Sequence, residues 1–136
     1  QVRIGALEKS DNPWMLELVA GLIDTDESPE EVAHREADEE AGLTLRSLHP
    51  ITRYYPSPGG SDEFVHLYCA LVDSRGVGGI HGLAEEGEDI RVSLWPREQA
   101  LHALHSGRID NAASIIALQW LQLNVDQLRA GAGDAP

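Results

Sequence analysis

The chain has little of several residue types, and each shortage excludes something. Among its 136 residues there is one cysteine, Cys69, and 10 basic residues stand against 23 acidic ones. A lone cysteine has no partner for an internal disulfide, so we expect a reducing compartment, the cytoplasm. The formal net charge of −13 argues against a nucleic-acid binder and against docking on an anionic membrane surface. No apolar run approaches the roughly 20 residues of a membrane span.

The length fits one domain, and an apolar fraction of 42% is enough for one hydrophobic core. We expect the domain to occupy residues 1–129 and the small residues of 130–136 to be a disordered tail. The chain opens at Gln1 in what reads as a strand already under way. We therefore expect its natural N-terminus to lie further upstream.

Apolar periodicity and turn residues predict a mixed set of strands and helices. We expect strands at 2–4, 14–19, 51–55, 64–72 and 90–95, with a glycine-rich loop at 75–82. Helices are expected at 29–41, from Pro96 to Gly107, and from Asp110 or Asn111 to about Leu128. This order indicates an α/β (α+β) fold whose sheet is covered on its faces by helices.

The helix at 29–41 has well-defined start and stop signals. Ser28 is a good N-cap, Pro29 suits the first helical position, and Glu31 completes a capping box. Gly42 is the expected stop. These signals fix the register of the helix and therefore which side chains share a face.

Acidic residues are concentrated around this helix. Nine of the 23 acids lie between Asp24 and Glu40, and four more between Glu85 and Asp89. Glu36 and Glu40 are four apart and share a helix face, where their charges repel one another. A divalent cation such as Mg²⁺ would remove that repulsion and suits sites that also bind phosphate. A solvated acidic helix face is the alternative interpretation.

The full spacing distinguishes between these interpretations, because it resembles the Nudix box. That signature belongs to hydrolases of nucleoside diphosphates linked to another group. Its seven fixed positions are Gly21, Glu27, Arg35, Glu36, Glu39, Glu40 and Gly42. Ala37 departs from the pattern, since a larger aliphatic residue is common there. The resemblance implies the Nudix fold, a mixed β-sheet sandwiched between α-helices.

Three later segments resemble the branch of this family that hydrolyses ADP-ribose. Pro58 lies 16 residues beyond Gly42, residues 82–90 resemble a loop that supplies late acids, and residues 109–114 are similar as well. The resemblance implies Mg²⁺-dependent hydrolysis of ADP-ribose to AMP and ribose 5-phosphate. The alternatives are hydrolysis of another nucleoside diphosphate sugar and a non-catalytic nucleotide-binding module.

By the same resemblance, several residues would hold two to three Mg²⁺ ions, with Mn²⁺ as a substitute. Glu36 and Glu40 are the principal ligands, with the backbone carbonyl of Ala20, and Glu88 adds a ligand from a later loop. Glu86 is the candidate general base for the attacking water. Glu39 is the second candidate, acting as base or supporting the metal-bound water.

The remaining site residues are expected to bind substrate. Arg3 is a candidate phosphate contact, with an exposed strand arginine as the alternative. Ser57, Pro58 and Gly59 are expected to shape the terminal-ribose pocket, unless they form only a turn. Glu63 is expected to help on the same side.

The other box residues are expected to be structural. Glu27 and Arg35 should form an ion pair that braces the loop against the helix. Gly21 should allow a tight approach of the backbone, and Gly42 should cap the helix. The resemblance also implies a homodimer acting on a small nucleotide sugar.

Overall fold

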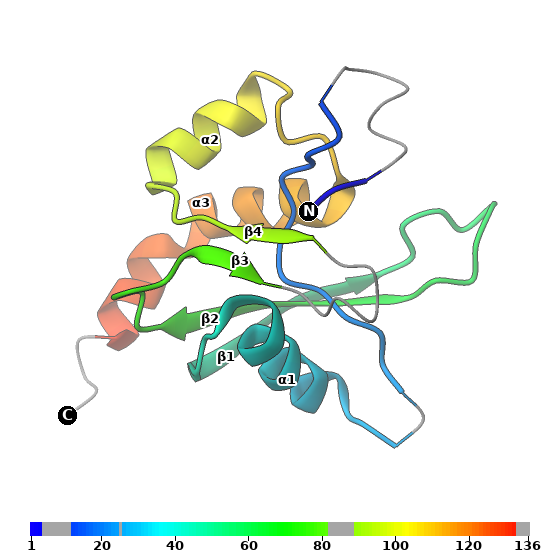
Figure 1. Cartoon of the computed structure of the whole chain (residues 1–136), viewed down its shortest axis with the longest axis horizontal. Coiled ribbons are helices and arrows are strands. Elements are labelled where there is room, and N and C mark those ends of the chain that lie inside the picture. Colours follow the sequence, from blue (N-terminus) through cyan, green and yellow to red (C-terminus); the bar gives the residue numbers. More distant parts are fainter. Residues whose placement is uncertain (4–11, 25, 82–88, 133–136) are drawn as a thin grey trace.

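The computed structural model describes residues 1–3, 12–24, 26–81 and 89–132, with only the backbone for residue 132. Within these ranges three helices and four strands follow one another along the chain, and Figure 1 shows their arrangement. In order they are α1 (Pro29–Ala41), β1 (Leu45–Tyr54), β2 (Val65–Val72), β3 (Gly79–His81), β4 (Ile90–Val92), α2 (Arg97–His105) and α3 (Ala112–Ala132).

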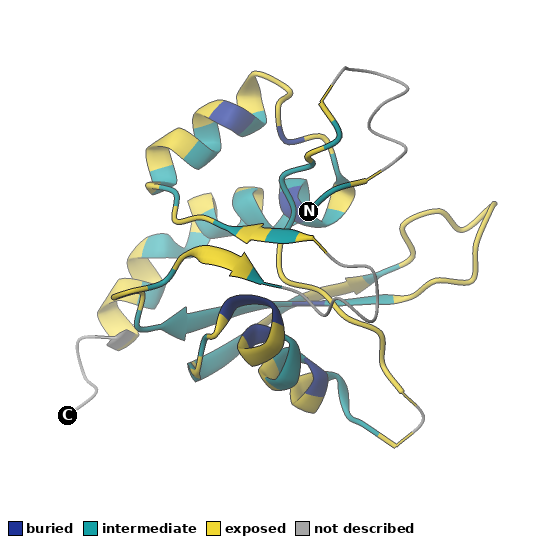
Figure 2. Ribbon diagram, viewed as in Figure 1, coloured by how far each residue is buried: buried dark blue, intermediate teal, exposed yellow. Residues whose placement is uncertain are grey.

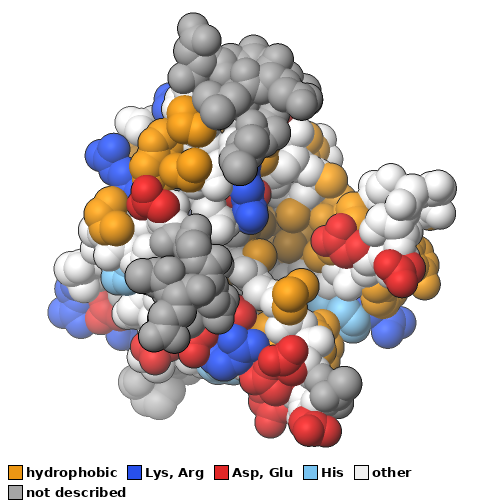
Figure 3. Space-filling model, turned by 45° about the vertical axis from the view of Figure 1, so that its right-hand side comes forward, with side chains coloured by type: hydrophobic (Ala, Val, Ile, Leu, Met, Phe, Trp, Pro, Cys, Tyr) orange, Lys and Arg blue, Asp and Glu red, His pale blue; other side chains and the backbone are white. Residues whose placement is uncertain are grey.

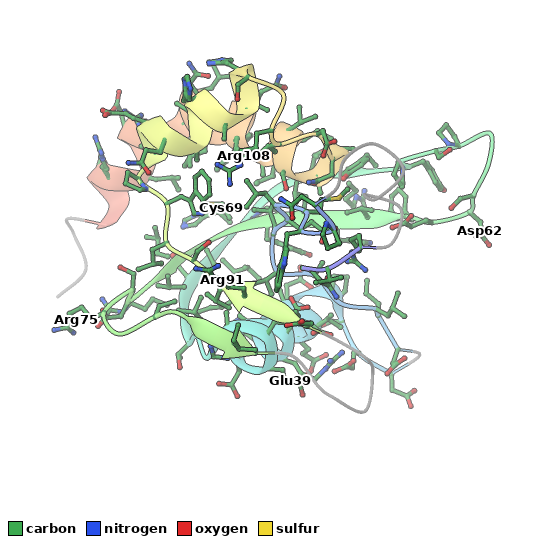
Figure 4. All side chains as sticks on the ribbon, turned by 45° about the horizontal axis from the view of Figure 1, so that its top comes forward. Glu39, Asp62, Cys69, Arg75, Arg91 and Arg108 are labelled. Atoms are coloured by element: carbon green, nitrogen blue, oxygen red, sulfur yellow. The ribbon has the colours of Figure 1, made fainter. Side chains whose placement is uncertain are left out.

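The strands lie between helices. α1 packs against β1, β3 and β4, whereas α3 contacts β2 and α2. In Figure 4, α2 and α3 lie above the strands and α1 lies below them. The expected α/β architecture is therefore confirmed. Within the described ranges the strands pair as two antiparallel sheets, β1 with β2 and β3 with β4.

The β1–β2 hairpin begins earlier than the sequence suggested. The pairing runs from Leu45 opposite Val72 to Tyr54 opposite Val65, with a register shift between Pro50 and Thr52. Proline lacks an N–H, which argues against a strand through residue 50. Proline is nevertheless tolerated in an edge strand and beside an irregularity in the pairing, and Pro50 lies next to such an irregularity. The expected strand at 64–72 is confirmed to within one residue.

The expected strand at 14–19 is wrong, and the last residue of the expected strand at 2–4 lies outside the described residues. Val2 and Trp14 form an isolated antiparallel bridge, and no strand extends over residues 14–19. The bridge is flanked by backbone bonds from Arg3 N–H to the Pro13 carbonyl (2.8 Å) and from Met15 N–H to the Gln1 carbonyl (2.9 Å). Further along, residues 18–24 pair with no strand in the described part of the chain. Apolar side chains alone do not make this segment a strand.

The glycine-rich segment contains a strand that we expected to be loop. Gly79 pairs with Val92 and His81 with Ile90, which makes β3 the partner of β4. Gly79 has a φ of 113°, a conformation that favours glycine. β4 ends at Val92 rather than at residue 95, since no described strand pairs with the residues beyond it.

The last two helices follow their sequence signals closely. α2 starts after Pro96 and ends at His105. At the start of α3, Asn111 Oδ1 accepts from Ser114 N–H (3.0 Å), so Asn111 rather than Asp110 is the cap. α3 continues to Ala132, so residues 130–132 are helical and not part of a tail. Residues 133–136 lie outside the described residues.

The buried apolar side chains are small or medium in size, and Figure 2 marks the buried residues in dark blue on the ribbon. The buried apolar residues are Val32, Ala37, Ala41, Leu67, Ala103 and Ile109. Ala37, the position that departs from the Nudix pattern, is thus part of the core. No described helix is long and apolar enough to cross a membrane.

Several large apolar residues before α1 remain at the surface. Leu18, Val19 and Ile23 are 41–45% exposed, and Leu22 is 85% exposed. Figure 3 shows hydrophobic side chains gathered in a hollow of one face, with acidic side chains below it. The segment before α1 therefore runs over the surface and not through the core.

Candidate functional site

Helix α1 carries the candidate site and is fixed at both ends. At its start Ser28 Oγ accepts from Glu31 N–H (3.3 Å), and the Glu31 carboxylate accepts from Ser28 N–H (2.8 Å). The bonds that the Glu31 carboxylate accepts from the Ser28 N–H and from the Ser28 hydroxyl (2.8 Å) lower the pKa of Glu31, and the backbone bond is the larger cause. At its end Gly42 has a φ of 61° and donates to the Asp38 carbonyl (2.8 Å). The expected caps are confirmed, and they set which α1 side chains face the site.

The expected ion pair between Glu27 and Arg35 is confirmed. Arg35 Nε and Nη2 donate to the two carboxylate oxygens of Glu27, each at 2.9 Å. This two-pronged contact lowers the pKa of Glu27 and raises that of Arg35. Arg35 Nη2 also donates to the Leu22 carbonyl (3.4 Å), so the guanidinium ties the acidic loop to the helix.

The same guanidinium holds two acids of its own helix. Arg35 Nη1 donates to Glu36 Oε1 (2.7 Å) and to Glu39 Oε2 (3.2 Å). Sequence reasoning missed these contacts, although the four-residue spacing of Arg35 and Glu39 is a signal for such a pair. One cation therefore offsets part of the repulsion among three carboxylates.

The segment before the loop packs directly on the acids of α1. The backbone N–H of Ala20 donates to Glu40 Oε2 (3.0 Å), and Glu40 is only 5% exposed. A β-carbon on residue 21 would overlap the Glu36 carboxylate, so glycine allows the backbone to approach that side chain. The structure thus brings Ala20, Gly21, Glu36 and Glu40 together and confirms the tight approach at Gly21.

These groups are suited to a hard divalent cation. The Glu36 and Glu40 carboxylates and the Ala20 carbonyl would supply only oxygen donors, which Mg²⁺ prefers. In the part of the chain that the structure describes, no group of three or more His, Cys, Asp or Glu side chains forms a metal site. A full set of ligands therefore needs others, and the expected Glu86 and Glu88 lie outside the described residues.

The expected substrate residues are not gathered around these acids. Residues 57–60 form an exposed turn, in which Gly60 N–H and Ser61 N–H both donate to the Ser57 carbonyl (2.9 Å). The hairpin that carries Pro58, Gly59 and Glu63 projects away from the body (Figure 1). In Figure 4 its Asp62 lies well apart from Glu39. Their contact with substrate stays a prediction.

The role of Arg3 as a phosphate contact also stays a prediction. Its Nε donates to both carboxylate oxygens of Glu17, at 3.1 and 3.2 Å, and half of the side chain is exposed. This surface pair uses one edge of the guanidinium. Binding a phosphate there would compete with Glu17.

Two features near the site were not predicted. Tyr68 O–H donates to Glu30 Oε1 (2.9 Å), which ties β2 to α1. At the base of the hairpin, the Tyr55 and Phe64 rings are tilted by 50° with their centroids 4.6 Å apart, and Phe64 meets His66 edge-on at 5.3 Å. Aromatic residues on both sides of the Pro-Gly turn were the available signal for this cross-strand cluster.

The glycine, the braced arginine and the helix acids have the arrangement that the box spacing implied. A model of the NUDIX domain matches residues 3–118, and the chain belongs to the Nudix family.

Individual relatives of known name give a more specific comparison than the family model. The chain is 51% identical over 129 residues to "ADP-ribose pyrophosphatase" of Escherichia coli (strain K12), covering 95% of this chain and 62% of the relative. It is 50% identical over 132 residues to the protein of the same name from Haemophilus influenzae, covering 95% and 61%. A "GDP-mannose pyrophosphatase" of Cronobacter sakazakii is 37% identical over 109 residues, covering 80% and 56%. The chain thus spans about 62% of the length of the first two relatives.

Proposed function

We propose that this Nudix domain hydrolyses the pyrophosphate bond of ADP-ribose, giving AMP and ribose 5-phosphate. The observation that carries the proposal is the meeting of Glu36, Glu40 and the Ala20–Gly21 backbone at one place. The high identity to two proteins named as ADP-ribose pyrophosphatases supports the choice of substrate.

In this proposal, Glu36, Glu40, the Ala20 carbonyl and Glu88 hold two to three Mg²⁺ ions, which Mn²⁺ can replace. When bound, such ions neutralise phosphate charge and make water a better nucleophile. Glu86 takes the proton of that water. Glu39 ranks second as the base because Arg35 already donates to its carboxylate.

The chain's own residues would also orient the substrate. Arg3 contacts a phosphate, while Ser57, Pro58, Gly59 and Glu63 shape the pocket for the terminal ribose. We further propose that the protein acts on this small molecule in the cytoplasm as a homodimer.

A second candidate is hydrolysis of another nucleoside diphosphate sugar. It is favoured by the 37% identity to a GDP-mannose pyrophosphatase. A non-catalytic nucleotide-binding module is a weaker alternative, because such a module would have no need to retain the acids of the box.

A substrate panel on the full-length protein tests the proposal. ADP-ribose, GDP-mannose and other nucleoside diphosphate sugars are supplied with Mg²⁺ and then with Mn²⁺, and the release of nucleoside monophosphate is measured. AMP release from ADP-ribose should exceed release from the other sugars. Turnover of another sugar with none of ADP-ribose would move the assignment to that substrate.

The Glu40→Gln variant connects the activity to this site. It keeps the size of a buried side chain but removes its charge, so turnover should fall at least a hundredfold. Asp38→Asn is the matched control, since Asp38 is an exposed acid on the same helix. Unchanged turnover in Glu40→Gln would remove Glu40 from the proposed metal site.

A further inference from the structure

A cleft of about 510 Å³ lies along α2, apart from the acids of α1. Its lining residues are Trp95, Glu98, Gln99, His102, Ala103, Ser106 and Arg108. Figure 4 shows Arg108 beneath α2 and Glu39 on the far side of the strands. The volume falls in the range of roughly 300–1,000 Å³ that is usual for small-molecule sites.

One wall of this cleft is a cation resting on an indole. The guanidinium carbon of Arg108 lies 5.2 Å from the centroid of the Trp95 ring, which is a cation–π contact. Each partner is fixed separately. Trp95 Nε1 donates to Ser93 Oγ (2.9 Å), and the backbone N–H of Arg108 donates to the Ala103 carbonyl (2.9 Å). Gly107, with a φ of 76°, turns the chain so that Arg108 returns toward the cleft.

Arg108 has donors to spare in this position. Among the described residues its guanidinium makes no ion pair or hydrogen bond, and the Trp95 ring is its contact. A guanidinium over an indole still presents N–H groups in its own plane, in the fork that matches two oxygens of a phosphate or carboxylate. His102, four residues after Glu98 on α2, adds an imidazole to the same cleft.

The cleft also has groups that bind hydroxyls. Glu98 and Gln99 are among its lining residues, and their side chains hydrogen-bond to no other described residue. A carboxylate accepts from the hydroxyls of a sugar, and a carboxamide can both accept from them and donate to them. Because Glu98 is negative, it would repel a second phosphate group, so a single anionic group is favoured.

We propose that this cleft binds a small phosphorylated sugar. Its phosphate pairs with Arg108 and His102, its hydroxyls bond to Glu98 and Gln99, and its carbon atoms pack on Trp95 and Ala103. Two kinds of ligand contain such a group, because a ribose that carries a phosphate is present both in free ribose phosphate and in a nucleoside monophosphate. The site lies outside the Nudix box, and its test needs no turnover, so it stands or falls separately from the proposed hydrolysis.

The test follows the indole N–H signal of Trp95 by NMR in the full-length protein, assigned by its loss in Trp95→Phe. Ribose 5-phosphate, AMP, inorganic phosphate and ribose are titrated separately. Ribose 5-phosphate should move the signal to saturation, at least tenfold more tightly than phosphate or ribose alone. If AMP moves the Trp95 signal as ribose 5-phosphate does, the ribose phosphate that the two share is sufficient for binding. If AMP does not move the signal while ribose 5-phosphate does, the cleft binds only free sugar phosphates.

Variants then locate the binding. Arg108→Gln should weaken ribose 5-phosphate binding at least tenfold, while Arg97→Gln, on α2 but outside the lining of the cleft, should leave that binding unchanged. Glu98→Gln should weaken ribose 5-phosphate but not inorganic phosphate. Circular dichroism checks the fold, and Arg108→Lys replaces the glutamine variant if that protein does not fold. No saturable movement of the Trp95 signal, or equal binding in the Arg108 variant, would overturn the proposal.

Discussion

The carboxylate of Glu36 occupies the space beside Gly21 where any other residue would place its β-carbon. Such a β-carbon would lie 1.7 Å from Glu36 Oε1 and 2.0 Å from Glu36 Cδ. Glu36 cannot swing away freely, because only 14% of its side chain is exposed and Arg35 donates to it at 2.7 Å. The glycine of the Nudix box is therefore a condition for the position of one proposed metal ligand.

Gly21→Ala should accordingly displace the Glu36 carboxylate. Crowding of this kind costs about 1–3 kcal/mol of unfolding free energy, and hydrolysis should fall more steeply than stability. Gly131→Ala is the control, since no atom lies within 4 Å of a β-carbon there. Urea denaturation and initial rates measure the two effects. A fully active and stable Gly21→Ala protein would contradict the close approach.

Acid should weaken the brace between the loop and α1. Arg35 lowers the pKa of Glu27 below its ordinary 4.5, so the stabilisation is present above pH 4.5 and is lost as the pH falls through the lower folded value. Glu27→Gln should flatten the dependence of unfolding free energy on pH in that window. Denaturation curves from pH 7 to pH 2 measure the change.

A second acid provides the control for this pH experiment. Asp73, bonded chiefly by Arg75, has a pKa lowered from 3.8 to about 2. Asp73→Asn should remove a contribution that is lost between pH 3.8 and pH 2 and leave the Glu27 contribution in place. Identical pH profiles for Glu27→Gln and the unchanged protein would rule out a contribution of the brace to stability.

Removal of divalent ions should lower thermal stability if α1 binds them. At a Mg²⁺ concentration one hundred times its Kd, a single site stabilises the folded protein by about 2.7 kcal/mol. Protein treated with EDTA should therefore gain Tm on addition of MgCl₂. Glu36→Gln and Glu40→Gln should lose most of this gain, and Asp38→Asn should keep it. An equal gain from NaCl at matched ionic strength would mean screening rather than binding.

The N-cap of α1 should contribute measurably to stability. Ser28→Ala removes the acceptor for Glu31 N–H, which costs about 1 kcal/mol, within a range of about 0.5–2 kcal/mol. Ser74→Ala, at an exposed serine outside the helices, is the control. Chemical denaturation measures both variants, and equal midpoints would mean that the cap adds nothing to stability.

Cys69 should be slow to react in the folded protein. Burial raises the pKa of its thiol above the ordinary 9.0, so little thiolate is present near neutral pH. Iodoacetamide labelling at pH 7.5, followed by mass spectrometry, should be slow without denaturant and rapid in urea. Labelling of the folded protein at the rate of a free cysteine peptide would show that the thiol is accessible.

The features predicted best from the sequence are those that depend on residues close together in the chain, such as helix ends. The bounds of α1 follow from Ser28, Pro29, Glu31 and Gly42, and the structure places all four as caps or first-turn residues. Local hydrogen bonding and helix geometry are enough to fix such bounds. The ion pair of Glu27 and Arg35 was predicted from the resemblance to the Nudix box, and the structure shows it.

Features that depend on a distant partner were harder to predict. Gly79 joins a strand only because Val92 pairs with it, and no local property of a glycine-rich segment indicates this. Residues 14–19 have strand composition, but among the described residues only Trp14 has a strand-like bridge partner, Val2. The contacts of Arg35 with Glu36 and Glu39 depend on a rotamer choice that a sequence does not specify.

The thirteen residues of α1 combine the capping box, the braced arginine and the acids at 36, 39 and 40. Unwinding of this helix would remove all of them at once, which makes α1 and the proposed metal site a single cooperative unit. Amide hydrogen exchange along α1 should then report directly on how often the site comes apart. Any ligand that holds the acids should slow exchange over the whole helix, including amides that it does not touch.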